Sequence, residues 1–138
     1  MHGRILLVDD NVSGSTARKT VLEELGHKIH MTCSGVEALE QFAQYKFDLV
    51  VTDYKMPRMD GLELIGRLRK LQPEILIILV SGFVDALGLS EATTGADAVI
   101  QKSANEVTHL VRSVTRLLRR KKPATAEGRA LKAKRQAG

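Results

Sequence analysis

The stretch VVTDYKMPRMDG, residues 50–61, begins as an apolar run, stops at an acidic residue and continues as a loop that contains proline and glycine. An uninterrupted apolar run is typical of a strand that is buried on both faces of a sheet, and Pro and Gly indicate a turn. Asp53 therefore stands at the end of a predicted buried strand. It is either the polar residue that ends the strand or a functional group that the strand holds in place.

Outward from this stretch, short apolar runs alternate with segments of helical period as far as residue 120. This alternation predicts an α/β fold, a parallel sheet with helices on both faces. The five expected strands are residues 4–8, 28–32, 47–52, 75–80 and 97–101. The runs ILLV, DLVV and ILIILV have no polar alternation, so their strands should be central, whereas the more polar residues 28–32 should form an edge.

The segments between the strands have the spacing of amphipathic helices. The first predicted helix has an apolar stripe of Ala17, Val21 and Leu25, and the last has a longer stripe over residues 107–118. Three helix starts show an oxygen cap followed three residues later by Glu: Ser34 with Glu37, Asp60 with Glu63, and Ser103 with Glu106. Residues 83–94 form the weakest predicted helix, because Gly and Thr lower its propensity, and we expect it to be the most mobile.

Composition limits the class of protein. The chain has 138 residues, of which 43% are hydrophobic and 27% charged, which fits one domain with a sizeable core. The longest apolar run, residues 75–80, is too short to cross a bilayer, and the N-terminus lacks the pattern of a signal peptide. The sequence thus predicts a cytoplasmic protein without membrane association.

The net charge of +5 is unevenly distributed along the chain. Residues 119–138 contribute +7, and residues 1–118 contribute −2. We therefore predict a domain over residues 1–120 and a basic, disordered tail over residues 121–138. Such a tail could bind nucleic acid by electrostatic attraction, although a solubilising end or the start of a linker is the favoured interpretation.

Polar side chains stand at the carboxyl ends of four of the predicted strands. Asp9 and Asp10 follow the first strand, Asp53 ends the third, Ser81 follows the fourth and Lys102 follows the fifth. In an open parallel sheet these ends share one edge, where ligands bind. Each residue alone would more often be a turn, cap or surface residue, but five such placements together favour a site.

Carboxylates that lie close together repel each other and gather around a cation. The oxygen ligands, without His or Cys, favour a hard ion, and Mg²⁺ suits a site with one or two carboxylates, water and a phosphate oxygen. Asp53 could then act as a nucleophile for a phosphoryl group, with Lys102 as a point charge and Ser81 as a hydrogen-bond donor to phosphoryl oxygens.

These residues resemble the receiver domain of two-component response regulators. The resemblance covers about residues 3–120 and rests on four motifs in family order: ILLVDDN, VVTDYKMPRMDGLEL, VSG and IQK. It implies a flavodoxin-like fold with strand order 2-1-3-4-5. It also implies a phosphorelay module that signals through protein contacts, as a monomer or weak dimer, and is no enzyme beyond its own phosphorylation and dephosphorylation.

The resemblance further implies a role for each site residue. Asp53 would be phosphorylated by a histidine kinase or a histidine phosphotransfer protein. Asp10 and Asp53 would ligate Mg²⁺, Asp9 would support the ion through water, and the backbone carbonyl of Lys55 would be another ligand.

Two positions depart from the family pattern. Ser103 stands where the family usually has Pro after the Lys, so the peptide bond before it is either trans or an uncommon cis bond. Val99 stands where the family commonly has an aromatic switch residue. Our hypothesis is that Ser81 and residues 83–94 transmit the signal instead, with Phe83 as the nearest aromatic side chain.

Other functions are weighed against this one. The chain could be the receiver part of a hybrid histidine kinase or larger regulator. It could be a receiver that binds partners without phosphorylation, but all the site residues are present. An aspartate-nucleophile phosphatase of the haloacid dehalogenase type would have a second Asp where Lys55 stands, which argues against that class.

Overall fold

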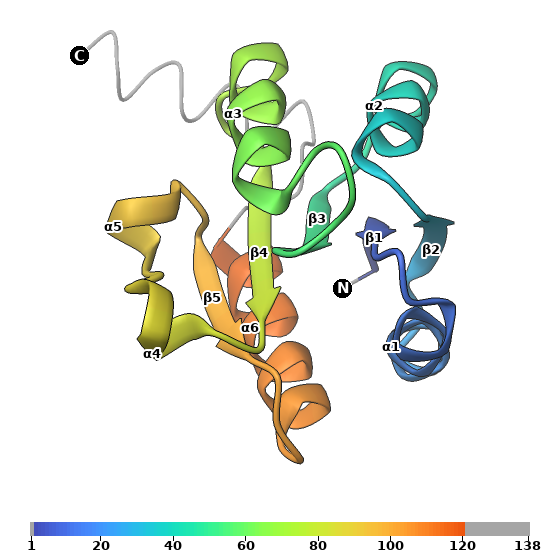
Figure 1. The fold of residues 1–138 in the computed structure, drawn as a ribbon. Helices are drawn as coiled ribbons and strands as arrows, with labels where there is room; N and C mark the ends of the chain where they lie inside the picture. Colours follow the sequence, from blue (N-terminus) through green and yellow to red (C-terminus); the bar gives the residue numbers. More distant parts are fainter. Residues whose placement is uncertain (1, 121–138) are drawn as a thin grey trace, which may run out of the picture.

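The computed structural model describes residues 2–120 of the chain (Figure 1). The predicted disordered tail, residues 121–138, lies outside the described residues. Within residues 2–120, no helix has both the length and the apolar character needed to cross a membrane.

A single parallel sheet forms the centre of the fold. Its strands are β1 (Arg4–Val8), β2 (Lys28–Thr32), β3 (Leu49–Asp53), β4 (Leu76–Ser81) and β5 (Ala98–Gln101), in the order β2-β1-β3-β4-β5. The α/β, flavodoxin-like fold class is therefore confirmed, with β2 at an edge and the apolar strands inside. The predicted strands starting at Phe47 and Ile75 begin too early: both residues are buried, but Ile75 donates its N–H to Gln72 in a turn.

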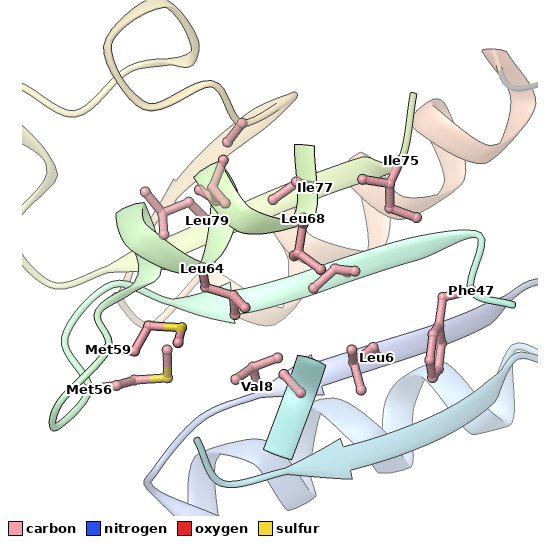
Figure 2. Close-up of a cluster of buried hydrophobic side chains, with 14 residues drawn as sticks. Leu6, Val8, Phe47, Met56, Met59, Leu64, Leu68, Ile75, Ile77 and Leu79 are labelled. Carbon is pink, nitrogen blue, oxygen red and sulfur yellow. The ribbon is translucent and has the colours of Figure 1, made fainter. Parts of the chain in front are cut away.

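Helices cover both faces of this sheet (Figure 1). Side chains alternate along each strand, so that Leu6, Val50 and Ile77 pack under α2 (Gly35–Gln44) and α3 (Gly61–Leu71). The intervening residues, such as Leu7 and Val51, pack under α1 (Val12–Glu24) and α6 (Glu106–Arg120). Figure 2 shows the first of these two clusters.

Helix α1 buries a different stripe from the one that its apolar residues predict. The buried residues are Ser15, Arg18 and Leu22, whereas Ala17 and Leu25 are exposed, so the predicted stripe is wrong. Asn11 caps the helix by accepting N–H groups of its first turn. An arginine can occupy the buried face because acidic partners lie beside it, as described below.

The segment between β4 and β5 forms two short helices in place of the single helix that we predicted. Helix α4 (Val84–Leu87) ends at Gly88, which has a left-handed backbone (φ 63), and α5 (Glu91–Thr94) follows. Ser90 and Thr93 form a capping box at the start of α5. The glycine and this internal cap divide the segment into two helices of one turn each.

The predicted caps of α2 and α3 are confirmed, and that of α6 is not. The side chains of Ser34 and Asp60 accept the N–H groups three residues ahead. The Ser103 hydroxyl accepts from Asn105 instead, and the Glu106 carboxylate turns to Arg18. No peptide bond in residues 2–120 is cis, so the bond before Ser103 is trans.

Candidate functional site

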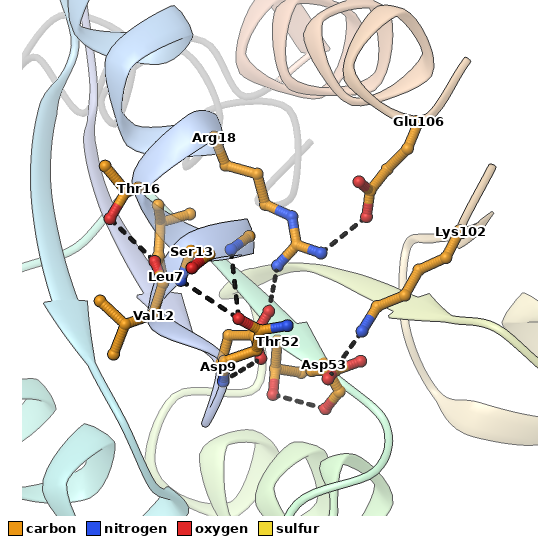
Figure 3. A network of polar contacts seen from close by, with 12 residues as sticks. Leu7, Asp9, Val12, Ser13, Thr16, Arg18, Thr52, Asp53, Lys102 and Glu106 are labelled. Atoms are coloured by element: carbon orange, nitrogen blue, oxygen red, sulfur yellow. Dashed lines mark hydrogen bonds and ion pairs between the residues drawn. The ribbon is translucent and has the colours of Figure 1, made fainter. Parts of the chain in front are cut away.

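The carboxyl ends of the strands bring the predicted site residues together at one edge of the sheet, and Figure 3 shows three of them, Asp9, Asp53 and Lys102. An open pocket of about 320 Å³ lies there. It is lined by Asp10, Asn11, Asp53, Lys55, Ser81, Gly82, Phe83 and Lys102. All the residues predicted from strand ends line this pocket except Asp9, which is buried behind it.

Asp53 is the last residue of β3 and is only 4% exposed. One carboxylate oxygen accepts the ammonium of Lys102 (Nζ to Oδ2, 2.9 Å), and the other accepts the backbone N–H of Tyr54 (3.0 Å). Burial raises the pKa of Asp53 and the charge of Asp9 adds to this, while the hydrogen bond and charge of Lys102 oppose the shift. The carboxylate is thus held in one orientation beside a cation.

The loop after Asp53 is held in place by two buried methionines and by the close packing of Gly61. Met56 and Met59 are buried in the cluster under α2 and α3 (Figure 2). The backbone of Gly61 passes so close to the Asp53 carbonyl that a Cβ atom would lie 2.5 Å from that oxygen. Only glycine fits there without a shift of the chain, so the start of α3 is packed directly against the strand end that carries Asp53.

Asp9 and Asp10 are neighbours in sequence but occupy different surroundings. Asp10 is exposed and lines the pocket, whereas Asp9 is 2% exposed. Both carboxylate oxygens of Asp9 are engaged: Oδ1 accepts the Asn11 N–H (2.8 Å), and Oδ2 accepts Nη1 of Arg18 (2.7 Å). Asp10 is therefore the freer of the two carboxylates to meet a ligand in the pocket.

The carboxylates of Asp9, Asp10 and Asp53 could hold a metal ion. One oxygen from each lies within 4.8 Å of the others. These are hard oxygen donors, and one of them, on Asp10, faces an open pocket that can hold water. The donor set fits Mg²⁺, which keeps water ligands and binds few carboxylates.

Ser81 is the last residue of β4, the strand next to β3, and Lys102 directly follows β5, the strand beyond β4. The Ser81 side chain is buried but lines the pocket, and its hydroxyl accepts the N–H of Phe83 (3.0 Å). Phe83 as a residue is 53% exposed, and the ammonium of Lys55 lies 6.0 Å from the centroid of its ring. Gln101, the residue before Lys102, bonds the same loop by donating to the Gly82 carbonyl (2.8 Å) and accepting from the Val84 N–H (3.1 Å).

Sequence reasoning missed two residues of this network, Arg18 and Glu106 (Figure 3). Arg18 is 3% exposed and connects Asp9 to Glu106, whose Oε1 lies 2.6 Å from Nη2 of Arg18. Burial alone would lower the pKa of Arg18, but the hydrogen bonds and charges of Glu106 and Asp9 raise it above its ordinary value. The available signal was a cation four residues before Leu22, and so on the same helix face, on the helix that follows the acidic pair.

Val99 is half-buried on β5 and packs against the cluster under α2 and α3. Its short branched side chain is not part of the pocket lining. The nearest aromatic side chain that lines the pocket is that of Phe83.

Comparison with known proteins assigns the fold and the site to a family. The family model of the response regulator receiver domain matches residues 5–115. The sensor kinase CckA of Brucella abortus is 40% identical over 83 residues, which are 59% of this chain and 9% of CckA. The chain thus spans a small part of this curated relative. The response regulator receiver protein CpdR of Brucella abortus is 28% identical over 83% of this chain and 96% of its own length.

A solved structure agrees with this assignment. The response regulator TrrA of Thermotoga maritima, in complex with Mg²⁺ and BeF, is 34% identical and covers 83% of this chain and 97% of its own, with a TM-score of 0.74. TrrA has also been solved in complex with the histidine kinase ThkA. With the family model matching most of the chain, and with Asp53 and its neighbours arranged at the strand ends, the chain belongs to the response regulator receiver domain family of two-component signal transduction.

Proposed function

We propose that this receiver domain accepts a phosphoryl group on Asp53 in a reaction that needs Mg²⁺. The observation that carries the proposal is the arrangement around Asp53. Its carboxylate is paired with Lys102 at 2.9 Å and belongs to a cluster of three carboxylates within 4.8 Å. This combination of nucleophile, cation and metal-binding oxygens is what phosphoryl transfer requires.

The residues of the pocket have distinct parts in this reaction. A carboxylate oxygen of Asp53 forms a bond to phosphorus while the bond from phosphorus to a histidine nitrogen of the donor breaks. Asp10, Asp53 and the carbonyl of Lys55, with Asp9 behind them, would hold Mg²⁺, which would supply charge neutralisation for the transferring group. Lys102 exchanges its contact with Asp53 for a phosphoryl oxygen, and the Ser81 hydroxyl donates to another.

We infer that the phosphoryl donor is a histidine kinase or a histidine phosphotransfer protein. The support is that the related regulator TrrA forms a complex with a histidine kinase. In this proposal the protein is a monomer or weak dimer in the cytoplasm. It signals through contacts with a downstream protein and turns over no external substrate. CckA is far longer than this chain, and CpdR is of similar length. The protein could therefore act as a stand-alone regulator or as a part of a larger kinase or regulator.

We also propose a division of the chain into two parts. Residues 1–120 would form the receiver domain, and residues 121–138 would be a basic appendage. Nucleic-acid binding by this appendage is a secondary proposal supported only by its charge.

The test is phosphorylation by acetyl phosphate with Mg²⁺, followed by intact mass spectrometry. We expect a single phosphoryl adduct on the wild type, because only the Asp53 carboxylate is paired with Lys102 in the pocket. Asp53→Asn should lose the adduct. Asp85→Asn, which neutralises an exposed carboxylate of α4 outside the pocket lining, should keep it.

Two results would contradict the proposal. One is a wild type that acquires no adduct with Mg²⁺ present. The other is an adduct of equal yield on Asp53→Asn, which would move the modification to another residue.

A further inference from the structure

Arg18 places a positive charge directly behind the proposed metal site. It comes from α1, and its guanidinium is buried between the end of β1 and the start of α6 (Figure 3). Nη1 lies 2.7 Å from Oδ2 of Asp9, and Nη2 lies 2.6 Å from Oε1 of Glu106. No hydrogen-bond partner within residues 2–120 meets Nε of Arg18. The contacts of this guanidinium are therefore concentrated on the two carboxylates.

The ion pair limits what Asp9 can do. With one oxygen bonded to Arg18 and the other to the Asn11 N–H, Asp9 can approach a metal directly only by giving up one of these bonds. Asp10, in contrast, is exposed to the pocket. Arg18 thus separates the acidic pair into one freely accessible carboxylate and one that is already neutralised.

The packing between α1 and α6 does not by itself require these charges. Two apolar side chains of similar volume could fill the same space without the cost of removing an arginine and a glutamate from water. The cation lies instead beside the carboxylate cluster, and because Arg18 and Asp9 are both buried, solvent screens the interaction between their charges only weakly.

We propose that Arg18 is a positioning residue that holds Asp9 in the outer sphere of Mg²⁺ and lowers the affinity of the site for the ion. Glu106 offsets part of this charge, so that Arg18 and Glu106 act on Mg²⁺ binding in opposite directions. This inference rests on the proposed Mg²⁺ binding at Asp10 and Asp53.

The experiment is a titration of the full chain with MgCl₂ alone, followed by calorimetry and by backbone amide shifts. Arg18→Met, which keeps an unbranched though shorter side chain and removes the charge, should bind Mg²⁺ more tightly, on the order of tenfold, because the positive charge beside the carboxylate cluster is lost. Arg18→Lys, the charge-matched control, should stay close to the wild type.

Glu106→Gln should change the affinity for Mg²⁺ in the opposite direction. It leaves Arg18 with less compensation and should weaken Mg²⁺ binding, by roughly twofold to threefold because Glu106 is partly solvated and farther from the pocket. A purely structural role of the ion pair would make Arg18→Met and Arg18→Lys alike, and would weaken binding or leave it unchanged in both.

The outcomes separate this inference from the proposed function. Wild type that binds Mg²⁺ saturably, together with Arg18→Met that binds equally or more weakly, would overturn the inference alone. If Arg18→Met does not fold, Glu106→Gln decides the question. Mg²⁺ binding by Glu106→Gln that is as tight as that of the wild type, or tighter, would also overturn the inference alone. Wild type with no saturable binding, or with binding that survives Asp10→Asn unchanged, would overturn the proposed metal site and this inference with it.

Discussion

The carboxylate of Asp53 is subject to opposing influences. Burial and the nearby charge of Asp9 raise its pKa, whereas Lys102 favours the ionised form. In the absence of metal, burial and the charge of Asp9 outweigh the effect of Lys102, and the pKa of Asp53 is raised. The folded protein therefore holds a proton on Asp53 more tightly than the unfolded chain does. A cation that enters the cluster favours the ionised form of Asp53, which is the nucleophilic form.

This balance predicts the effect of Asp53→Asn on stability in metal-free buffer. As pH rises from the ordinary range of an aspartate to above the raised pKa of Asp53, the folded wild type must release a proton that it binds more tightly than the unfolded chain, and the free energy of unfolding falls. Asp53→Asn has no such group. It should be more stable than the wild type at neutral pH in EDTA, as measured by urea denaturation.

The difference between the two proteins should disappear at a pH below the ordinary aspartate pKa, where Asp53 is protonated in both states. A neutral-pH stability of Asp53→Asn that is equal to or below that of the wild type would show that the pairing with Lys102 outweighs burial. Asp85→Asn is the control, because its carboxylate is exposed.

At the scale of elements, the segment from the end of β4 through α5 is the part best placed to respond to the site. Phe83 and Leu87 expose 53% and 49% of their surface, and the segment consists of two helices of four residues each. It is joined to the pocket by the bond from the Phe83 N–H to the Ser81 hydroxyl. Few buried contacts and short helices indicate low local stability.

We predict that a beryllofluoride phosphoryl mimic with Mg²⁺ shifts the backbone amides of residues 82–94. When the Ser81 hydroxyl turns to the mimic as a donor, its acceptor bond with Phe83 is disturbed, and the short helices adjust. Ser81→Ala should bind the mimic with shifts near Asp53 but lose most of the shifts in residues 82–94. Ser34→Ala, at the start of α2 and outside the pocket lining, should behave like the wild type.

Amide shifts that leave residues 82–94 unchanged in the wild type would contradict this hypothesis. The signal would then have to leave the site by another element. Val99 is a poor candidate for that role, because it is half-buried against the cluster under α2 and α3 and does not line the pocket.

At the scale of the whole molecule, the parallel sheet concentrates charge at one end. Three carboxylates meet there, and cations reach them from two sides, Lys102 from β5 and Arg18 from α1. The two hydrophobic clusters on the faces of the sheet hold these groups in place. A ligand that neutralises the remaining carboxylate charge should therefore stabilise the entire fold.

We expect added Mg²⁺ to raise the free energy of unfolding of the wild type, by about 2.7 kcal/mol when the ion is at about 100 times its dissociation constant. Excess EDTA should reverse the gain. Asp10→Asn, which removes the accessible carboxylate, should lose most of it. An equal gain in Asp10→Asn would mean that the ion stabilises the protein from another place, and denaturant midpoints with and without Mg²⁺ distinguish the two cases.

Local patterns in the sequence were sufficient for the sheet and for the predicted site. Uninterrupted apolar runs marked β1, β3 and β4 as interior strands, and the polar residues at strand ends converged because parallel strands end at the same edge. The caps of α2 and α3 were also readable, since each involves residues only three positions apart.

Only the tertiary structure decided the role of Arg18 and Glu106, which lie 88 residues apart in the chain. Apolar spacing predicted the wrong face for α1, because an arginine that finds two carboxylates can be buried where spacing rules expect a hydrophobic residue. Glu106 was predicted to support a helix cap, but the distant cation binds it more strongly than a local N–H can. Apolar periodicity and capping are properties of neighbouring residues, whereas a buried ion pair depends on which elements the completed fold brings into contact.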